Sequence, residues 1–104
     1  MRFLISSKPK FPVPPEAVAA LLAAMGQWVQ KHSSSKKMEQ IWGFAVGGGG
    51  GGILNVASHE ELNAIMAEMP FSLFSDTDVQ PIIPIEVGLK SFDDAVKRMT
   101  GGAK

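Results

Sequence analysis

The feature that most constrains the fold of this chain is a run of six consecutive glycines, Gly47 to Gly52, between two strand-like stretches. Residues 37–46 alternate in polarity, as a half-buried strand does, and residues 51–57 are mostly β-prone. A hairpin turn needs only about two or three residues with positive φ, which glycine adopts without steric cost. We therefore predict a β-hairpin in which some glycines lie inside the strands and leave room above the sheet.

The alternation in the first arm of the hairpin predicts which side chains share a face. It places Met38, Gln40, Trp42, Phe44 and Val46 on one face of the strand. The residues between them, from Glu39 onward, belong to the opposite face.

Periodicity and helix-boundary signals predict the elements on either side of the hairpin. Four prolines within residues 8–15 predict an extended linker after the first strand. Ser58 and Glu61 have the spacing of a capping box, which predicts the start of the second helix. The predicted elements are strands at 2–7, 37–46, 51–57 and 76–87 and helices at 15–32, 59–69 and 91–99.

This order predicts a single α+β domain over residues 1–104 with the ferredoxin-like βαββαβ arrangement. Its four strands form an antiparallel sheet with helices on one face, followed by a C-terminal helix. The other face carries Trp42 and Phe44, which form an apolar patch too large to leave in water. We expect a second copy to cover that face, giving a homodimer or higher oligomer.

Composition excludes several functional classes. The chain has no cysteine, which rules out disulfides, thiolate catalysis and cysteine-ligated metals. Ten basic and ten acidic residues cancel, so neither a nucleic-acid nor an anionic-membrane partner is expected. The apolar run near the N-terminus is too short for a signal peptide or a membrane span, so we expect a cytoplasmic protein without cofactor or metal.

The stretch from Glu39 to Ile82 resembles muconolactone isomerase and its relatives in the dimeric α+β barrel superfamily. The resemblance rests on a strand containing Ile41-Trp42, the turn Leu54-Asn55-Val56-Ala57-Ser58, the helix SHEELNAIMAEMP and the run FSLFSDTDVQPI. It covers roughly two-fifths of the chain. It implies an oligomeric, cofactor-free barrel that moves a proton on an unsaturated lactone carboxylate, using a base, an acid and a cationic anchor.

The chain departs from the family pattern at the hairpin. The isomerases carry polar and aromatic side chains there, including histidine and tyrosine, where this sequence has Gly47 to Gly52. They also carry an arginine next to the tryptophan of the second strand, where this sequence has Gly43. These differences predict a pocket with fewer side chains than the family pattern.

Two residues are candidates for catalysis. Glu39 would act as a base if its carboxylate were buried, because burial raises a carboxyl pKa. His32, at the end of the first helix, is a candidate acid or base, although a histidine there also suits the helix dipole. Each has a structural alternative, a solvated strand residue for Glu39 and a helix cap for His32.

Five further residues are candidate ligand contacts. Trp42 would line a pocket or pack in a dimer core. Asp78 lies two residues from Asp76 on one strand face, but no third ligand at metal-site spacing accompanies them. The candidate ligand-binding residues are Gln40, Trp42, Phe44, Asn55 and Asp78.

Three functions follow from these residues. The first is an oligomeric barrel that binds a small apolar or lactone-like molecule between sheets and is a cofactor-free isomerase. The second is a non-catalytic oligomeric or interaction protein, which the scarcity of buried polar candidates favours. The third is a cofactor-free monooxygenase, for which Asn55 and Trp42 are present without a convincing His or Arg partner.

Overall fold

The computed structural model describes residues 1–101, so the last three positions of the predicted 1–104 domain lie outside the described part. One antiparallel sheet has the strand order β2-β3-β1-β4. The strands are β1 (Arg2–Pro9), β2 (Met38–Gly43), β3 (Gly50–Asn55) and β4 (Ser75–Ile82). The helices are α1 (Val18–Ser34), α2 (His59–Ala67) and α3 (Ile85–Met99), with 3-10 turns η1 (Pro15–Ala17) and η2 (Ser72–Phe74).

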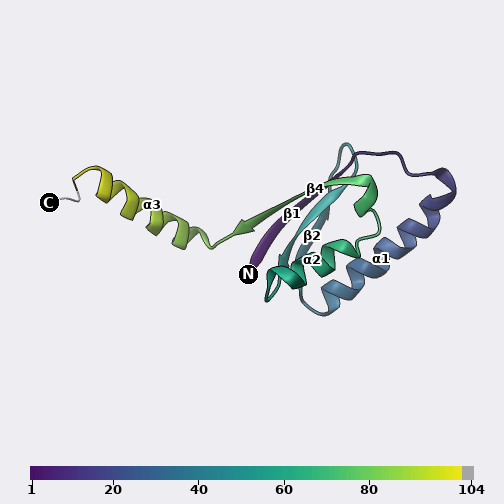
Figure 1. The fold of residues 1–104 in the computed structure, drawn as a ribbon, viewed down its shortest axis with the longest axis horizontal. Coiled ribbons are helices and arrows are strands. Elements are labelled where there is room, and N and C mark those ends of the chain that lie inside the picture. Colours follow the sequence, from purple (N-terminus) through teal and green to yellow (C-terminus); the bar gives the residue numbers. More distant parts are fainter. Residues whose placement is uncertain (102–104) are drawn as a thin grey trace.

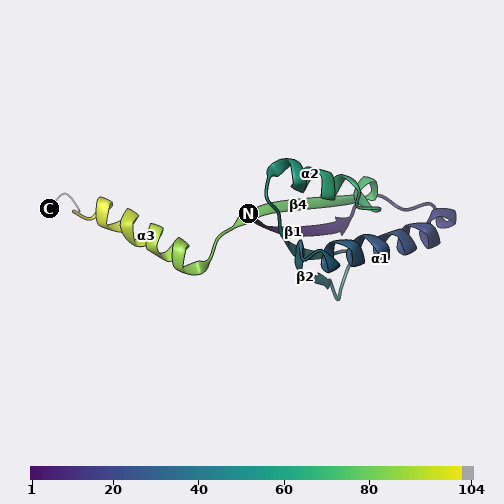
Figure 2. The ribbon, with the colours of Figure 1, turned by 90° about the horizontal axis from the view of Figure 1, so that it is seen from below.

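The molecule has two layers and an extension. Helices α1 and α2 lie on the same face of the sheet, and α3 projects away from both layers (Figures 1 and 2). No helix of the described residues covers the other face of the sheet (Figure 1). The ferredoxin-like α+β arrangement predicted from the order of elements is therefore confirmed.

The core lies between the sheet and the two helices. Leu54 of β3 is fully buried, and Trp28 of α1 donates its indole Nε1–H to the Ile65 carbonyl of α2 over 3.1 Å. That hydrogen bond satisfies the one polar group of a buried tryptophan and joins the two helices. The buried apolar side chains are Phe3, Ile5, Trp28, Met38, Leu54, Val56, Ile65 and Met69.

The start of α2 follows directly from the sequence. Ser58 Oγ accepts a hydrogen bond from the Glu61 N–H over 3.1 Å, and the Glu61 carboxylate accepts from the Ala57 N–H over 2.9 Å. Both backbone donors would otherwise lack partners at the helix start. Lys37 also binds Glu61 at 2.6 Å, and these hydrogen bonds lower the pKa of the Glu61 carboxyl.

A β-bulge in β2 makes the predicted face assignment wrong at Met38 and Glu39, whereas Gln40 and Trp42 lie on the predicted face. The register shifts between Met38 and Gln40, so Met38 pairs with Leu54 but Gln40 pairs with Ile53. One extra residue reverses the alternation from that point on. Met38 and Ile41 therefore face the helices, whereas Gln40 and Trp42 lie on the other side of the sheet.

The glycine run divides between the turn and the second strand. Gly47, Gly48 and Gly49 have positive φ, and Gly50 to Gly52 begin β3. The Phe44 N–H donates to the Gly49 carbonyl over 3.0 Å, so β2 ends at Gly43 and does not continue to residue 46 as predicted. The glycines of β3 leave little empty space, because a Cβ on Gly51 would lie 2.9 Å from Trp42 Nε1.

The predicted strand 76–87 is wrong in its second half. Strand β4 ends at Ile82, and α3 begins at Ile85, six residues before the start predicted at Ser91. Pro84 stands at the N-cap position with extended φ and ψ, and its carbonyl accepts the Val87 and Gly88 N–H groups. The alternating isoleucines suggested a strand, but proline cannot continue the ladder and suits a helix start.

The uncovered face of the sheet is mixed in character. Arg2, Gln40, Asn55, Asp78 and Gln80 share it with Leu4, Trp42, Ile53 and Ile82. Leu4 is 36% exposed and Trp42 is 37% exposed, so each is already partly covered by its neighbours. The apolar patch expected on this face is therefore interrupted by polar side chains.

Candidate ligand-binding site

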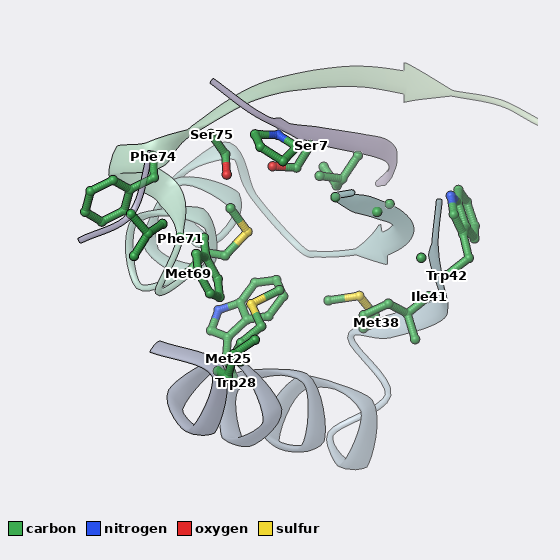
Figure 3. Close-up of a pocket in the computed structure, with 18 of the residues that line it drawn as sticks. Ser7, Met25, Trp28, Met38, Ile41, Trp42, Met69, Phe71, Phe74 and Ser75 are labelled. Atoms are coloured by element: carbon green, nitrogen blue, oxygen red, sulfur yellow. The ribbon is translucent and has the colours of Figure 1, made fainter. Parts of the chain in front are cut away.

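A cavity of about 650 Å³ lies on the helix-facing side of the sheet (Figure 3). Its walls come from β1 and the linker after it, from α1, from the β2–β3 hairpin, and from the segment between α2 and β4. Phe11 and Leu22, which also line it, are 56% and 60% exposed, so the cavity opens to solvent at this rim. Its volume is within the usual range of small-molecule sites.

Sequence and packing explain why a cavity forms here. The prolines after β1 hold the linker extended, which separates Phe11 from the helix that follows. Gly49 and Gly50 form part of the hairpin wall and contribute only backbone atoms to it. Opposite them, Met25 and Trp28 of α1 point into the cavity (Figure 3).

The lining is almost entirely apolar. None of the lining side chains in the described part of the chain is a carboxylate, imidazole, ammonium, guanidinium or phenol. Among residues 1–101, the hydroxyls in the lining are those of Ser7 and Ser75, and the Trp28 N–H is already bonded to the Ile65 carbonyl. Flexible thioethers and aromatic rings supply most of the contact surface. The aromatic and methionine side chains of the lining are Phe11, Met25, Trp28, Met38, Trp42, Met69, Phe71 and Phe74.

Trp42, a predicted ligand contact, lines this cavity at its edge. Its position over Gly51 puts the indole close to the other face of the sheet, and Figure 3 shows the ring turned away from Met25 and Trp28. Trp42 therefore contributes to the wall next to the hairpin, while Trp28 lies deeper in the cavity.

His32, a predicted catalytic residue, lies outside the cavity. Its side chain is buried, packs edge-on against Trp28 with ring centroids 5.3 Å apart, and contacts a Glu68 oxygen through Nε2 at 2.7 Å. The hydrogen bond from His32 is the main cause that lowers the pKa of the Glu68 carboxyl. This arrangement joins α1 to the end of α2. The His32 ring also packs against the Trp28 indole.

Glu39, the other predicted catalytic residue, lies on the uncovered face of the sheet. Arg2 donates to it through Nε at 2.8 Å and Nη2 at 3.2 Å, and Asn55 donates through Nδ2 at 3.4 Å. The Arg2 hydrogen bond is the main cause that lowers the Glu39 pKa, so the group is a stable carboxylate and a weak base. Glu39 and Asn55 are thus brought together with Arg2, and His32 is not part of this cluster.

The three remaining candidates do not line the cavity. Gln40 pairs with Ile53, and Asp78 pairs with Ser6, so both lie on the uncovered face. Phe44 is half-buried at the end of the hairpin, where the Lys8 ammonium lies 5.8 Å from the centre of its ring.

Metal and membrane features were also sought. Within residues 1–101, no three His, Cys, Asp or Glu side chains lie close enough to hold a metal ion. Over the same residues, no helix combines the length and the apolar character that crossing a membrane requires.

Sequence reasoning missed most of the cavity and part of the Glu39 cluster. Met25 and Trp28 belong to the apolar stripe of α1, and periodicity does not distinguish a filled core from a hollow one. Ser7 and Ser75 lie at strand ends without a motif. The contact of Arg2 with this cluster follows from strand pairing, since Arg2 is directly opposite Asn55 in the antiparallel register.

Comparison with known proteins agrees with the fold. The family model described as muconolactone delta-isomerase matches residues 1–85. A crystal structure of muconolactone isomerase is similar in fold, with a TM-score of 0.74 and 21% sequence identity over 81% of this chain and 90% of that chain. Among curated proteins, no significant match is found. Because the family match spans most of the sequence, this chain belongs to the muconolactone delta-isomerase family.

Proposed function

We propose that this protein binds a small, largely apolar molecule in the cavity between the sheet and α1. The observation that carries the proposal is the cavity itself, about 650 Å³ in volume and lined by aromatic and methionine side chains. Such a surface gains free energy by excluding water and adapts to ligand shape. The sequence led us to expect a ligand between two sheets, whereas this cavity lies on the helix-covered side of one sheet.

The methionines provide a direct test. Met25, Met38 and Met69 line the cavity, whereas Met1, Met66 and Met99 do not. With methyl-labelled methionine and naphthalene as the probe, we expect NMR shifts of the first three signals and none of the other three. Shifts of all six, or of none, would contradict the proposal.

A substitution that blocks the rim of the cavity gives a second test, with a matched control on the same helix. Leu22→Trp puts a large side chain at the mouth of the cavity, and Gln27→Trp puts the same side chain on an exposed position of α1 outside it. We expect the first substitution to weaken naphthalene binding at least about tenfold and the second to leave it unchanged.

The family match favours cofactor-free proton transfer on an unsaturated lactone as a second candidate function. Within the described residues the cavity offers no ionisable side chain for it, and the two predicted catalytic residues, Glu39 and His32, both lie outside the lining. The test is solvent deuterium exchange into an unsaturated lactone by the wild type, Glu39→Gln and His32→Gln, with the exposed Glu60→Gln as control. Exchange that neither substitution slows would remove both residues from the mechanism, and no exchange by the wild type would remove the isomerase function.

We also propose that the chain self-associates, because α3 carries an exposed apolar stripe. No residue of α3 is buried, and Leu89, Phe92 and Met99 are 60%, 68% and 84% exposed. An isolated helix of this length is marginally stable in water. The stripe consists of Ile85, Leu89, Phe92, Val96 and Met99.

A second copy of the chain is the partner we assign to this stripe. The opposite side of α3 carries acidic and basic residues in balance, among them the pairs Lys90–Asp94 and Lys97–Asp93, and lacks the basic excess of a membrane-surface helix. A two-fold arrangement would bury two such stripes at once, and the neutral net charge opposes it little.

A further inference from the structure

Two serine hydroxyls lie together at one end of the cavity. Ser7 and Ser75 lie on the neighbouring strands β1 and β4, and both face the helices. Figure 3 shows their oxygens together on one side of the cavity, opposite Met25 and Trp28 of α1. The site therefore has a polar end on the sheet and an apolar body on the helix.

The hydroxyls of Ser7 and Ser75 both remain available to bind a ligand. Ser7 Oγ and Thr77 Oγ1 are 3.0 Å apart, and their mutual bond uses one of two hydroxyl hydrogens, which leaves the other free. Ser75 Oγ makes no hydrogen bond within residues 1–101, and its residue is half-buried. A ligand at this end therefore finds a donor and several acceptor lone pairs.

The same end offers nothing to a charged group. No cationic side chain lines the cavity in the described part of the chain, and Lys10, whose ammonium lies 5.6 Å from the centre of the Phe11 ring, is exposed at the rim. Moving a carboxylate from water into such a site costs far more than a neutral hydroxyl or carbonyl does.

We propose that the cavity selects a neutral molecule with an aromatic or alicyclic body and one hydroxyl or carbonyl group, which binds Ser7 and Ser75, and that it rejects the corresponding carboxylate. This selectivity rests on the proposed ligand-binding function and deepens it. Ser7 and Ser75 are then the specificity-determining residues, and the Thr77 hydroxyl positions Ser7.

The test compares three probes of nearly equal size, namely naphthalene, 2-naphthol and 2-naphthoate, by calorimetric titration of the full chain at pH 7. One added hydrogen bond should make 2-naphthol bind roughly three- to tenfold more tightly than naphthalene. The carboxylate should bind at least about tenfold more weakly than 2-naphthol.

Substitutions of single serines test which side chains cause the preference for 2-naphthol. Ser7→Ala and Ser75→Ala, made separately, should each reduce the preference for 2-naphthol over naphthalene, measured as the ratio of the two affinities in the same variant. Ser6→Ala is the matched control, because Ser6 precedes Ser7 on β1 but faces the other side of the sheet. Two independent serine variants keep the test decisive if one of them does not fold, which circular dichroism would show.

The outcomes separate this inference from the function on which it depends. Binding of naphthalene without a preference for 2-naphthol, or a preference that survives both serine substitutions, overturns the selectivity and leaves the binding function intact. Tighter binding of 2-naphthoate, lost in Lys10→Gln, would show that a rim cation reaches the ligand and would also overturn it. Binding of none of the three probes would remove the proposed function as well.

Discussion

At the scale of single residues, backbone conformation at the hairpin decides what the sequence can tolerate. Gly47 and Gly49 both have positive φ, +87° and +80°, but their surroundings differ. A Cβ on Gly49 would collide with the Ser7 carbonyl oxygen, whereas a Cβ on Gly47 would meet nothing within 4 Å. The tip of the hairpin is therefore pressed against β1, next to one end of the cavity.

This pair gives a matched prediction. Gly47→Ala should destabilise the fold by about 1–2 kcal/mol, the cost of a left-handed conformation for alanine. Gly49→Ala should cost at least about 1 kcal/mol more, because the backbone must move to relieve the collision. Urea unfolding of both variants measures the difference, and equal losses would show that the collision relaxes freely.

Gly26 presents the opposite case. It lies inside α1 with ordinary helical geometry, and no neighbouring atom lies within 4 Å of an added Cβ. Nothing in the structure explains a glycine at this position. Gly26→Ala should stabilise the protein by about 0.5–1 kcal/mol, as judged by urea unfolding, since alanine loses less backbone entropy in a helix. A loss of stability would show that a partner approaches α1 at this position.

At the scale of elements, α1 and α2 are joined on one side by a polar contact that holds the wall of the cavity. Glu68 accepts from His32 at 2.7 Å and from Lys31 at 3.4 Å, while Trp28 bonds the Ile65 carbonyl. Because Trp28 packs against His32 and also lines the cavity, the joint between the helices determines where this indole lies.

The joint predicts a pH dependence of stability. The pKa of Glu68 is lowered in the folded state from 4.5, mainly by the His32 hydrogen bond. A lowered carboxyl pKa stabilises the fold above the unfolded-state value, and the contribution is lost as pH falls through the folded-state value. Glu68→Gln should therefore reduce the free energy of unfolding at pH 7 and have a smaller effect below pH 4.

Urea unfolding at the two pH values checks this expectation. Glu60→Gln, on the exposed side of the same helix, is the control, since Glu60 forms no ion pair within the described residues. A loss in Glu68→Gln that is equal at both pH values would mean that packing of the side chain, and not its charge, stabilises the joint.

At the scale of the whole molecule, a single copy is far from compact. Its extents are 68 × 28 × 23 Å and its radius of gyration is 18.1 Å, compared with about 13 Å for a globular chain of this length. The projecting α3 accounts for the difference (Figure 1). The family match ends at residue 85, where this helix begins, so the apolar stripe of α3 lies almost wholly beyond the matched region.

The shape leads to a prediction about mass in solution. The double substitution Leu89→Asp with Phe92→Asp places two charges in the apolar stripe and should convert an oligomer to single copies, as measured by sedimentation velocity. Ser91→Asp adds a charge outside the stripe and should leave the mass unchanged. A wild-type protein that sediments as a single folded copy would contradict the self-association proposal directly.

The candidate site was predictable only where local patterns were sufficient. Trp42 was expected to line a pocket or to pack in a dimer core, and in the structure it lies in the wall of the cavity. Glu39 and His32 were chosen by residue type, but their partners, Arg2 and Glu68, are 37 and 36 positions away in the sequence. Such partners determine whether a carboxylate or an imidazole faces a cavity, a strand or another helix.

The sequence by itself determined the elements that depend on neighbouring residues, namely the capped start of α2, the glycine turn and the βαββαβ order with its family. Tertiary structure alone decided three things: the face on which Met38 lies, the point at which β4 gives way to α3, and the existence of the cavity. The bulge at Met38 depends on how β2 and β3 pair, and the cavity depends on the spacing between α1 and the sheet. Periodicity records which side chains share a face, but only the packed layers determine whether the space they enclose is filled.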